Sequence, residues 1–126
     1  MQPQFEHVHY RCSDLEEVKR FYCDVMGAEY LDTVELSDGR RIMKLRLGGV
    51  LLFFSPAAEV RTPEPADQRM GAYHIAFFVE DHDEAVAYYK QRGAKFVREG
   101  IMASPTLKVA FIEAPDGMQV ELMQKL

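Results

Sequence analysis

Side chains that bind metals or anions alternate near the start of the chain. In EHVHYRCSDLEE (residues 6–17), His7, His9 and Arg11 occupy every second position, so on a β-strand they share one face. Imidazole is a common metal ligand and proton carrier, and guanidinium pairs well with carboxylate or phosphate. The stretch therefore predicts a strand face that carries chemistry, provided that other elements bring further groups to it.

Those elements follow from a repeat in the sequence. In each half, an alternating strand leads into a helix that begins at an N-cap aspartate and ends at a glycine, and three more strands follow. In the first half the caps are Asp14 and Gly27 and the strands span 5–12, 29–36, 41–47 and 50–55; in the second they are Asp81 and Gly93, with strands at 72–79, 95–98, 106–113 and 118–123. The chain therefore reads as a doubled βαβββ unit.

This repeat predicts the fold class and the domain layout. We expect one α+β domain over residues 1–126, in which two tandem βαβββ modules form a curved mixed sheet. The first module covers about 1–55 and the second about 71–126. Residues 56–70 contain three prolines and no hydrophobic period, so they are expected to link the modules.

Aligning the two halves brings a candidate metal site into view. His7 precedes the cap Asp14 by seven positions and His74 precedes Asp81 by seven, so the two histidines are equivalent. Alternation assigns the apolar positions to the helix side of each strand, namely Tyr73, Ile75, Phe77 and Val79 in one strand and Met118, Val120 and Leu122 in the last. The opposite, concave side then receives His74 and Glu121.

Two imidazoles and one carboxylate on a concave sheet face are typical of a divalent-metal site for Fe, Mn, Ni, Co or Zn, with coordination positions open for substrate. Taken singly, each residue has a simpler interpretation. A lone strand histidine is more often a hydrogen-bonded core residue, and Glu121 could be an edge carboxylate. The coincidence of all three favours the metal.

Further cations are expected on the same side of the first module. Apolar residues at 43, 45 and 47 suit the helix side, which turns Lys44 and Arg46 toward the concave side with Arg11 and His9. Such a cavity favours an anionic or enolate-forming substrate. The alternative is that these cations sit at the sheet rim and reach solvent.

Composition narrows the class of partner. A formal charge of −5 argues against nucleic acid and against anionic membranes, which both attract clustered Lys and Arg. No apolar run approaches the length of a membrane span and no signal peptide is evident, so we expect a cytoplasmic protein that binds a small molecule. Exposed sheet edges favour a homodimer. Cys12 and Cys23 are expected to be reduced core thiols, and His82 a solvated surface residue.

The sequence resembles the vicinal oxygen chelate superfamily, which includes glyoxalase I, methylmalonyl-CoA epimerase, extradiol dioxygenases, fosfomycin resistance enzymes and bleomycin resistance proteins. The likeness lies in EHVHYRCSDLEEVKRFYCDVMGAEY, in its repeat AYHIAFFVEDHDEAVAYYKQRGAKF, and in the closing APDGMQVELM. It implies paired βαβββ modules around a metal, whose site forms within one chain or across a dimer. By this resemblance His7, His74 and Glu121 match metal ligands.

One position departs from the family pattern. Glyoxalase I carries a second glutamate where this chain has Phe53, four residues after Gly49, as Glu121 stands four after Gly117. Phenylalanine neither binds a metal nor moves a proton, so strict lactoylglutathione lyase chemistry is in doubt, and Phe53 is expected to line the substrate cavity instead.

Three functions are therefore considered. The first is a metal-dependent lyase or isomerase of glyoxalase-like type, in which the ion stabilises an enolate and Glu121 or His9 moves the proton. The second is a non-haem Fe(II) extradiol-type dioxygenase using the two histidines and one carboxylate. The third is a metal-free, bleomycin-resistance-like binding protein, against which the retained ligand set argues.

Overall fold

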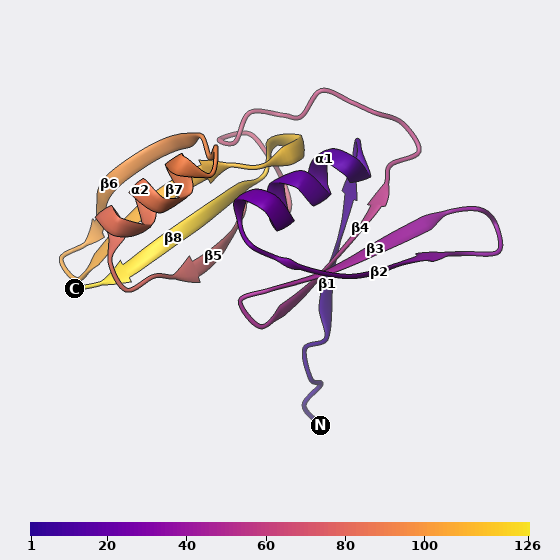
Figure 1. Ribbon diagram of the computed structural model, residues 1–126, viewed down its shortest axis with the longest axis horizontal. Helices are drawn as coiled ribbons and strands as arrows, with labels where there is room; N and C mark the ends of the chain where they lie inside the picture. The colour runs from indigo at the N-terminus through magenta and orange to yellow at the C-terminus, as the bar shows by residue number, and fades with distance from the viewer. The chain divides into compact units, whose positions relative to one another are not determined.

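The computed structural model describes all residues, 1–126, as two compact units, Met1–Arg61 and Thr62–Leu126. Each unit combines one helical segment with one four-stranded sheet (Figure 1). The first contains β1 (His7–Cys12), α1 (Leu15–Lys19), which continues as a π-helix (Arg20–Val25), β2 (Glu29–Glu35), β3 (Arg41–Leu47) and β4 (Val50–Pro56). The second contains β5 (His74–Phe78), α2 (His82–Gln91), β6 (Phe96–Ser104), β7 (Leu107–Glu113), a 3₁₀ turn (Pro115–Gly117) and β8 (Gln119–Lys125).

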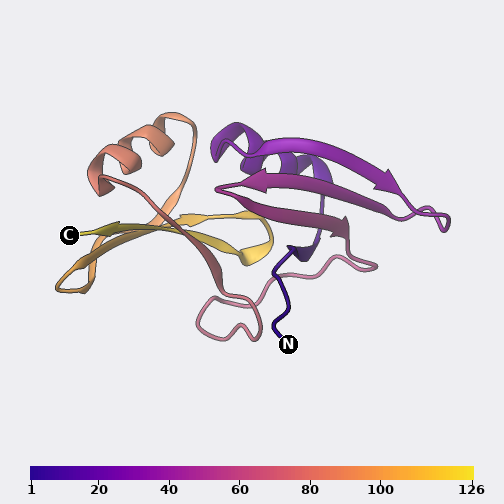
Figure 2. The ribbon, with the colours of Figure 1, turned by 90° about the horizontal axis from the view of Figure 1, so that it is seen from below.

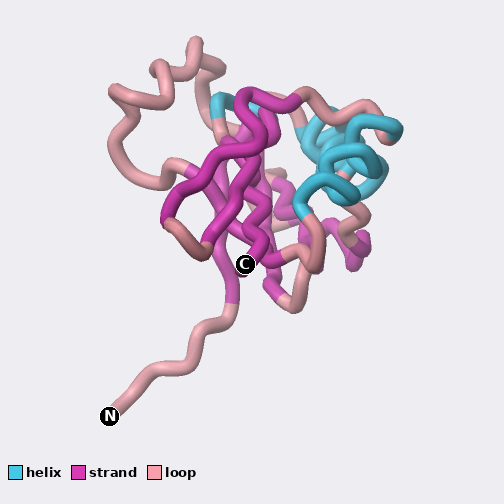
Figure 3. Tube along the Cα trace, turned by 90° about the vertical axis from the view of Figure 1, so that its left-hand side faces the viewer, coloured by secondary structure: helices cyan, strands magenta, loops and turns pink.

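The two sheets have the same topology, which confirms the doubled βαβββ prediction. Their strand orders are β1-β4-β3-β2 and β5-β8-β7-β6. In each, the first strand pairs in parallel with the last, and the other neighbours are antiparallel. Residues 57–73 contain neither helix nor strand, as the long loop in Figure 3 shows.

The predicted helix boundaries are also confirmed. The carboxylate of Asp14 accepts a hydrogen bond from the backbone N–H of Glu16 at 2.9 Å, and that of Asp81 accepts one from Glu84 at 2.8 Å. These bonds satisfy N–H groups that the first turn leaves free. Beyond each helix Gly27 and Gly93 take positive φ values of 84° and 94°, which glycine adopts without the steric cost of a Cβ.

Each unit buries an apolar core between its helix and one face of its sheet. Fully buried residues include Val18, Leu45 and Leu52 in the first unit and Ile112, Val120 and Leu122 in the second. Each such side chain contributes roughly 1.5–3 kcal/mol by leaving water. Figure 2 shows α2 lying along one face of its sheet. The other face of each sheet, here called the helix-free face, is left for functional side chains.

The sixth strand is longer than predicted. The expected strand at 95–98 stops before Gly100, whereas β6 runs on to Ser104. Its pairing with β7 shifts register between Arg98 and Ile101, so a bulge absorbs the glycine, whose φ is 68°, and pairing resumes. No helix in the structure is long and apolar enough to cross a lipid bilayer.

Candidate metal centre

His74 and Glu121 meet on the helix-free face of the second unit. The strands β5 and β8 run in parallel with Ala76 opposite Glu121 and His74 opposite Gln119. The His74 ring leans toward Glu121, so that Nε2 lies 3.3 Å from Oε1. The two side chains are 29% and 12% exposed. Sequence alternation therefore correctly predicted that these two residues share a face, and the structure brings them into contact.

His7 holds the equivalent position in the first unit. There β1 pairs in parallel with β4, with His7 opposite Leu51 and His9 opposite Phe53. This is the register of the second unit, so His7 corresponds to His74 and Phe53 to Glu121. The His7 ring stacks on Phe53 with centroids 4.0 Å apart and planes 17° from parallel. The position that holds a carboxylate in one unit thus holds an aromatic platform in the other.

A carboxylate orients the His7 ring. Nδ1 of His7 donates a hydrogen bond to Oε2 of Glu6, which leaves Nε2 as the nitrogen not engaged by that contact. Carboxylate partners of this kind fix the ring of a metal-binding histidine and raise its basicity. Sequence reasoning missed Glu6, although its place beside His7 in the chain was a usable signal.

The donor set fits a divalent ion. In the second unit an imidazole nitrogen and a carboxylate oxygen are already in contact, and both are ligands that first-row divalent metals accept. Nδ1 of His74 is buried without a hydrogen-bond partner. A metal bound to Nε2 would hold the His74 ring in the neutral tautomer that carries its hydrogen on Nδ1. No three His, Cys, Asp or Glu side chains are grouped to hold a metal ion in the structure.

Ser55 links His9 to Arg11 on the helix-free face of the first unit. Its buried hydroxyl lies 2.8 Å from His9 Nε2 and accepts a hydrogen bond of 2.8 Å from Arg11 Nη1. Because guanidinium only donates, the serine oxygen is the acceptor of the Arg11 hydrogen bond. Nε2 of His9 is the ring nitrogen engaged by Ser55, and Nδ1 is not part of this contact. Partial burial, then the charges of Arg11 and His7, lower the pKa of His9.

The two other predicted cations lie on β3. Lys44 is paired with Phe53 across β3 and β4, and its Nζ lies 5.2 Å from the centre of that ring. Arg46 is exposed and forms a 3.5 Å ion pair with Glu29 on β2. Met43 and Leu45 between them are buried, as the alternation predicts. Lys44 thus lies beside Phe53, on which the His7 ring stacks, while Arg46 pairs with β2 at the sheet edge.

Aromatic side chains surround the His74 ring. Phe111, paired with Glu121 across β7 and β8, lies 5.5 Å from it edge-on. The Arg98 guanidinium lies 4.6 Å from the Phe111 ring. Tyr73 was expected on the helix side, and that expectation is wrong. It precedes β5, is 37% exposed, and contacts His74 and Phe111 at 4.6 Å and 6.4 Å between centroids.

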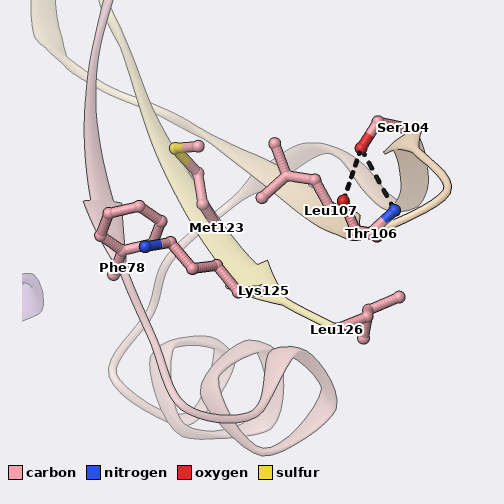
Figure 4. A pocket seen from close by; sticks show the side chains of 7 residues that line it. All are labelled: Phe78, Ser104, Thr106, Leu107, Met123, Lys125 and Leu126. Atoms are coloured by element: carbon pink, nitrogen blue, oxygen red, sulfur yellow. Dashed lines mark hydrogen bonds between the residues drawn. The ribbon is translucent and has the colours of Figure 1, made fainter.

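A pocket of about 420 Å³ opens toward the end of β8, where Met123 and Lys125 line it (Figure 4). These two residues follow Glu121 on the helix-free face of β8. The ammonium group of Lys125 lies 4.2 Å from the Phe78 ring, as Figure 4 shows. The remaining lining residues are Ser104, Thr106, Leu107 and Leu126. The pocket is therefore mainly apolar with one cation at its wall.

His82 is not the surface residue that the sequence suggested. It is 3% exposed, because it lies where α2 meets the β6 bulge. Its Nε2 accepts a hydrogen bond of 2.9 Å from the backbone N–H of Gly100, and its Nδ1 lies 2.7 Å from the Asp83 carboxylate. A backbone donor on Nε2 assigns the proton to Nδ1. His82 therefore ties the start of α2 to β6 and has no contact with the candidate centre.

Comparisons with known proteins identify the family. The family model of the Glyoxalase/Bleomycin resistance protein/Dioxygenase superfamily matches residues 4–122, so the chain belongs to this superfamily. A probable lactoylglutathione lyase of Synechocystis is 32% identical over 123 residues, covering 94% of this chain and 92% of the relative. A 2-epi-5-epi-valiolone epimerase of Actinomyces is 31% identical over 140 residues, covering 93% and 76%.

Solved structures agree on the fold. A glyoxalase family protein from Enterococcus faecalis superposes with a TM-score of 0.82 at 24% identity, covering 96% of this chain and 97% of that one. The fosfomycin resistance protein FosX from Listeria monocytogenes, complexed with Mn(II) and sulfate, gives a TM-score of 0.70 at 16% identity, covering 100% and 95%. The glyoxalase-like fold class predicted from the sequence is therefore confirmed.

Proposed function

We propose that this protein is a divalent-metal-dependent enzyme of lyase or isomerase type, acting on a small anionic substrate with adjacent oxygens. The observation that carries the proposal is the contact between His74 and Glu121 on the helix-free face, with His7 at the equivalent position of the other unit. Relatives named as a lactoylglutathione lyase and an epimerase support this class of reaction. We take His7, His74 and Glu121 as the ligand set.

Each site residue then has a distinct task. The ion would supply Lewis-acid stabilisation of the negative charge that develops on adjacent substrate oxygens. Glu121 is the candidate base, because its carboxylate is mostly enclosed and touches His74. Ser55 occupies Nε2 of His9, so Nδ1 is the nitrogen left to exchange a proton with substrate oxygen.

The cations and the pocket suggest how a substrate would be held. Arg11 and Lys44 supply positive charge on the helix-free face of the first unit, Arg11 held by Ser55 and Lys44 placed over Phe53. Both suit a carboxylate or phosphate group. The pocket of the second unit suits an apolar group of a substrate, with Lys125 at its edge.

Exchange of a substrate proton tests the proposal. Protein loaded with Mn(II), Ni(II), Co(II) or Zn(II) is incubated in D₂O with a hemithioacetal or an α-hydroxy ketoacid, and loss of the carbon-bound proton is followed by NMR. We expect exchange that falls by roughly 100-fold or more in Glu121→Gln, the usual contribution of a general base. Fully loaded protein that exchanges no substrate proton would contradict the proposal.

A second candidate is an extradiol-type dioxygenase. It is favoured by Phe53, which leaves two histidines and one carboxylate as the complete ligand set, the combination found in non-haem Fe(II) oxygenases. Oxygen uptake with catechols, measured after anaerobic loading with Fe(II), distinguishes it from the first. Uptake with ring cleavage and without α-proton exchange would replace the first function by the second.

A further inference from the structure

The two equivalent histidines differ in what holds their rings. Nδ1 of His7 donates to the carboxylate of Glu6, whereas Nδ1 of His74 is buried with no hydrogen-bond partner. A buried polar atom without a partner is costly, and native structures contain few of them. The first ring is therefore fixed by the protein alone, and the second lacks the same support.

The missing partner is next to His74 in the sheet. Gln119 lies opposite His74 in the parallel pairing of β5 and β8, so both side chains project from the same face. Gln119 is 8% exposed, and its Oε1 is likewise buried without a hydrogen-bond partner. Nδ1 of His74 and Oε1 of Gln119 are the two buried side-chain polar atoms in this structure that have no hydrogen-bond partner. One is a ring nitrogen and the other an amide oxygen, which are complementary once the nitrogen carries a proton.

Metal binding supplies the reason for that proton. An ion on Nε2 of His74 leaves the ring neutral with its hydrogen on Nδ1, and histidine ligands almost always donate this hydrogen to a second group. We propose that Gln119 is the positioning residue of this centre, whose Oε1 accepts the Nδ1 hydrogen of His74 when Nε2 holds the ion. The proposal rests on the proposed function for the metal.

The arrangement makes the metal centre asymmetric. Glu6 offers a charged acceptor to one histidine, while Gln119 offers a neutral one to the other. A neutral acceptor fixes the tautomer and orientation of His74 without adding a further negative charge beside Glu121. Glu121 is then the sole carboxylate next to that ring, which suits its role as base.

Zn(II) affinity separates a positioning role from a structural one. We compare wild type with Gln119→Met, an unbranched side chain without an acceptor, and with Gln119→Glu, which keeps one. Gln119→Met is expected to bind Zn(II) roughly 10- to 100-fold more weakly, the usual effect of removing such a partner, and Gln119→Glu to bind as tightly as wild type or more so. Without metal, Gln119→Met is expected to be no less stable in urea, because it removes an unsatisfied acceptor.

Gln124→Met is the matched control. Gln124 lies on the same strand, and its Oε1 accepts a 2.7 Å hydrogen bond from the backbone N–H of His82. Its loss is expected to lower stability while Zn(II) affinity stays the same. The Nδ1 hydrogen of His74 gives a direct readout by ¹H–¹⁵N NMR of the Zn(II) form. It is expected as a slowly exchanging signal in wild type and Gln119→Glu, and lost or fast-exchanging in Gln119→Met.

The outcomes separate the two proposals. If wild type binds Zn(II) no better than His74→Ala, the metal site itself is refuted. If wild type binds through His74 but Gln119→Met matches it in affinity and in the Nδ1 signal, only the role of Gln119 is overturned. Equal weakening in Gln119→Met and Gln119→Glu also overturns that role, since the carboxylate keeps an acceptor.

Discussion

Replacing His82 by alanine is predicted to weaken the second unit strongly. The change removes the acceptor of the Gly100 N–H, which lies at the β6 bulge. Gly100 is exposed and this hydrogen bond is only partly buried, so its loss costs about 0.5–1.5 kcal/mol. The lost packing of a side chain that is only 3% exposed adds to this, so we expect the free energy of unfolding to fall by about 2–4 kcal/mol.

Loss of the hydrogen bond between His82 and Asp83 contributes little to the destabilisation. The Asp83 carboxylate is exposed and also pairs with Lys108 at 3.1 Å. It does provide a second readout. The His82 hydrogen bond, followed by Lys108, holds the pKa of Asp83 below its ordinary value. In His82→Ala that pKa is therefore expected to rise, which carboxyl ¹³C NMR measures.

Urea unfolding followed by circular dichroism measures the stability change, with an unchanged m-value as the sign of an unaltered transition. His82→Gln is the matched variant, because its amide oxygen reaches the position of Nε2 and keeps an acceptor for Gly100. We expect it to recover most of the loss, together with slow amide exchange at Gly100. A cost below about 1 kcal/mol for alanine, or no advantage of glutamine over alanine, would refute the reasoning.

Three further predictions concern the first unit. Burial, aided by Asp24, raises the pKa of the Cys23 thiol, so its alkylation by iodoacetamide at pH 8 should be slower in the folded protein than in urea; equal rates would contradict this. The pKa of His9 is lowered, so its contribution to stability falls as the pH drops below about 6.5, where the unfolded chain takes up the proton first. Arg11→Met should raise that pKa in an NMR titration, and an unchanged midpoint would exclude the Arg11 charge as a cause. Phe53→Glu adds a carboxylate at the position equivalent to Glu121 and should bind metal at least about tenfold more tightly than Phe53→Gln; equal affinities would argue against a shared ion.

Local signals explain why much of the fold was predictable. Asp14 and Asp81 cap their helices through bonds that span only two or three residues, and strand alternation depends on neighbours in the chain. The equivalence of His7 and His74 follows from both signals, and the matching strand registers agree with it.

Features that depend on contacts between distant segments were not predictable. Ser55 reaches His9 and Arg11 only because β4 pairs with β1. His82 looked like a solvated residue at a helix start, and its burial arises from its contact with Gly100 at the β6 bulge, beyond the strand predicted at 95–98. A glycine in a strand has two interpretations, an end or a bulge, and its partner strand decides between them.

The lack of hydrogen-bond partners at Nδ1 of His74 and Oε1 of Gln119 could not be inferred from the sequence either. Alternation places both on one face, but it does not say which of their atoms are enclosed or already bonded. That information comes from side-chain packing around β5 and β8. Only with this packing known do the ring nitrogen of His74 and the amide oxygen of Gln119 point to a bound metal ion.

Metal content of the purified protein tests the central claim most directly. Protein prepared without a histidine tag is analysed by inductively coupled plasma mass spectrometry, alongside His74→Ala and the structural control His82→Gln. We predict about one divalent ion per chain in wild type and in His82→Gln, and loss of the ion in His74→Ala. A metal content that is the same in His74→Ala as in wild type would contradict the account.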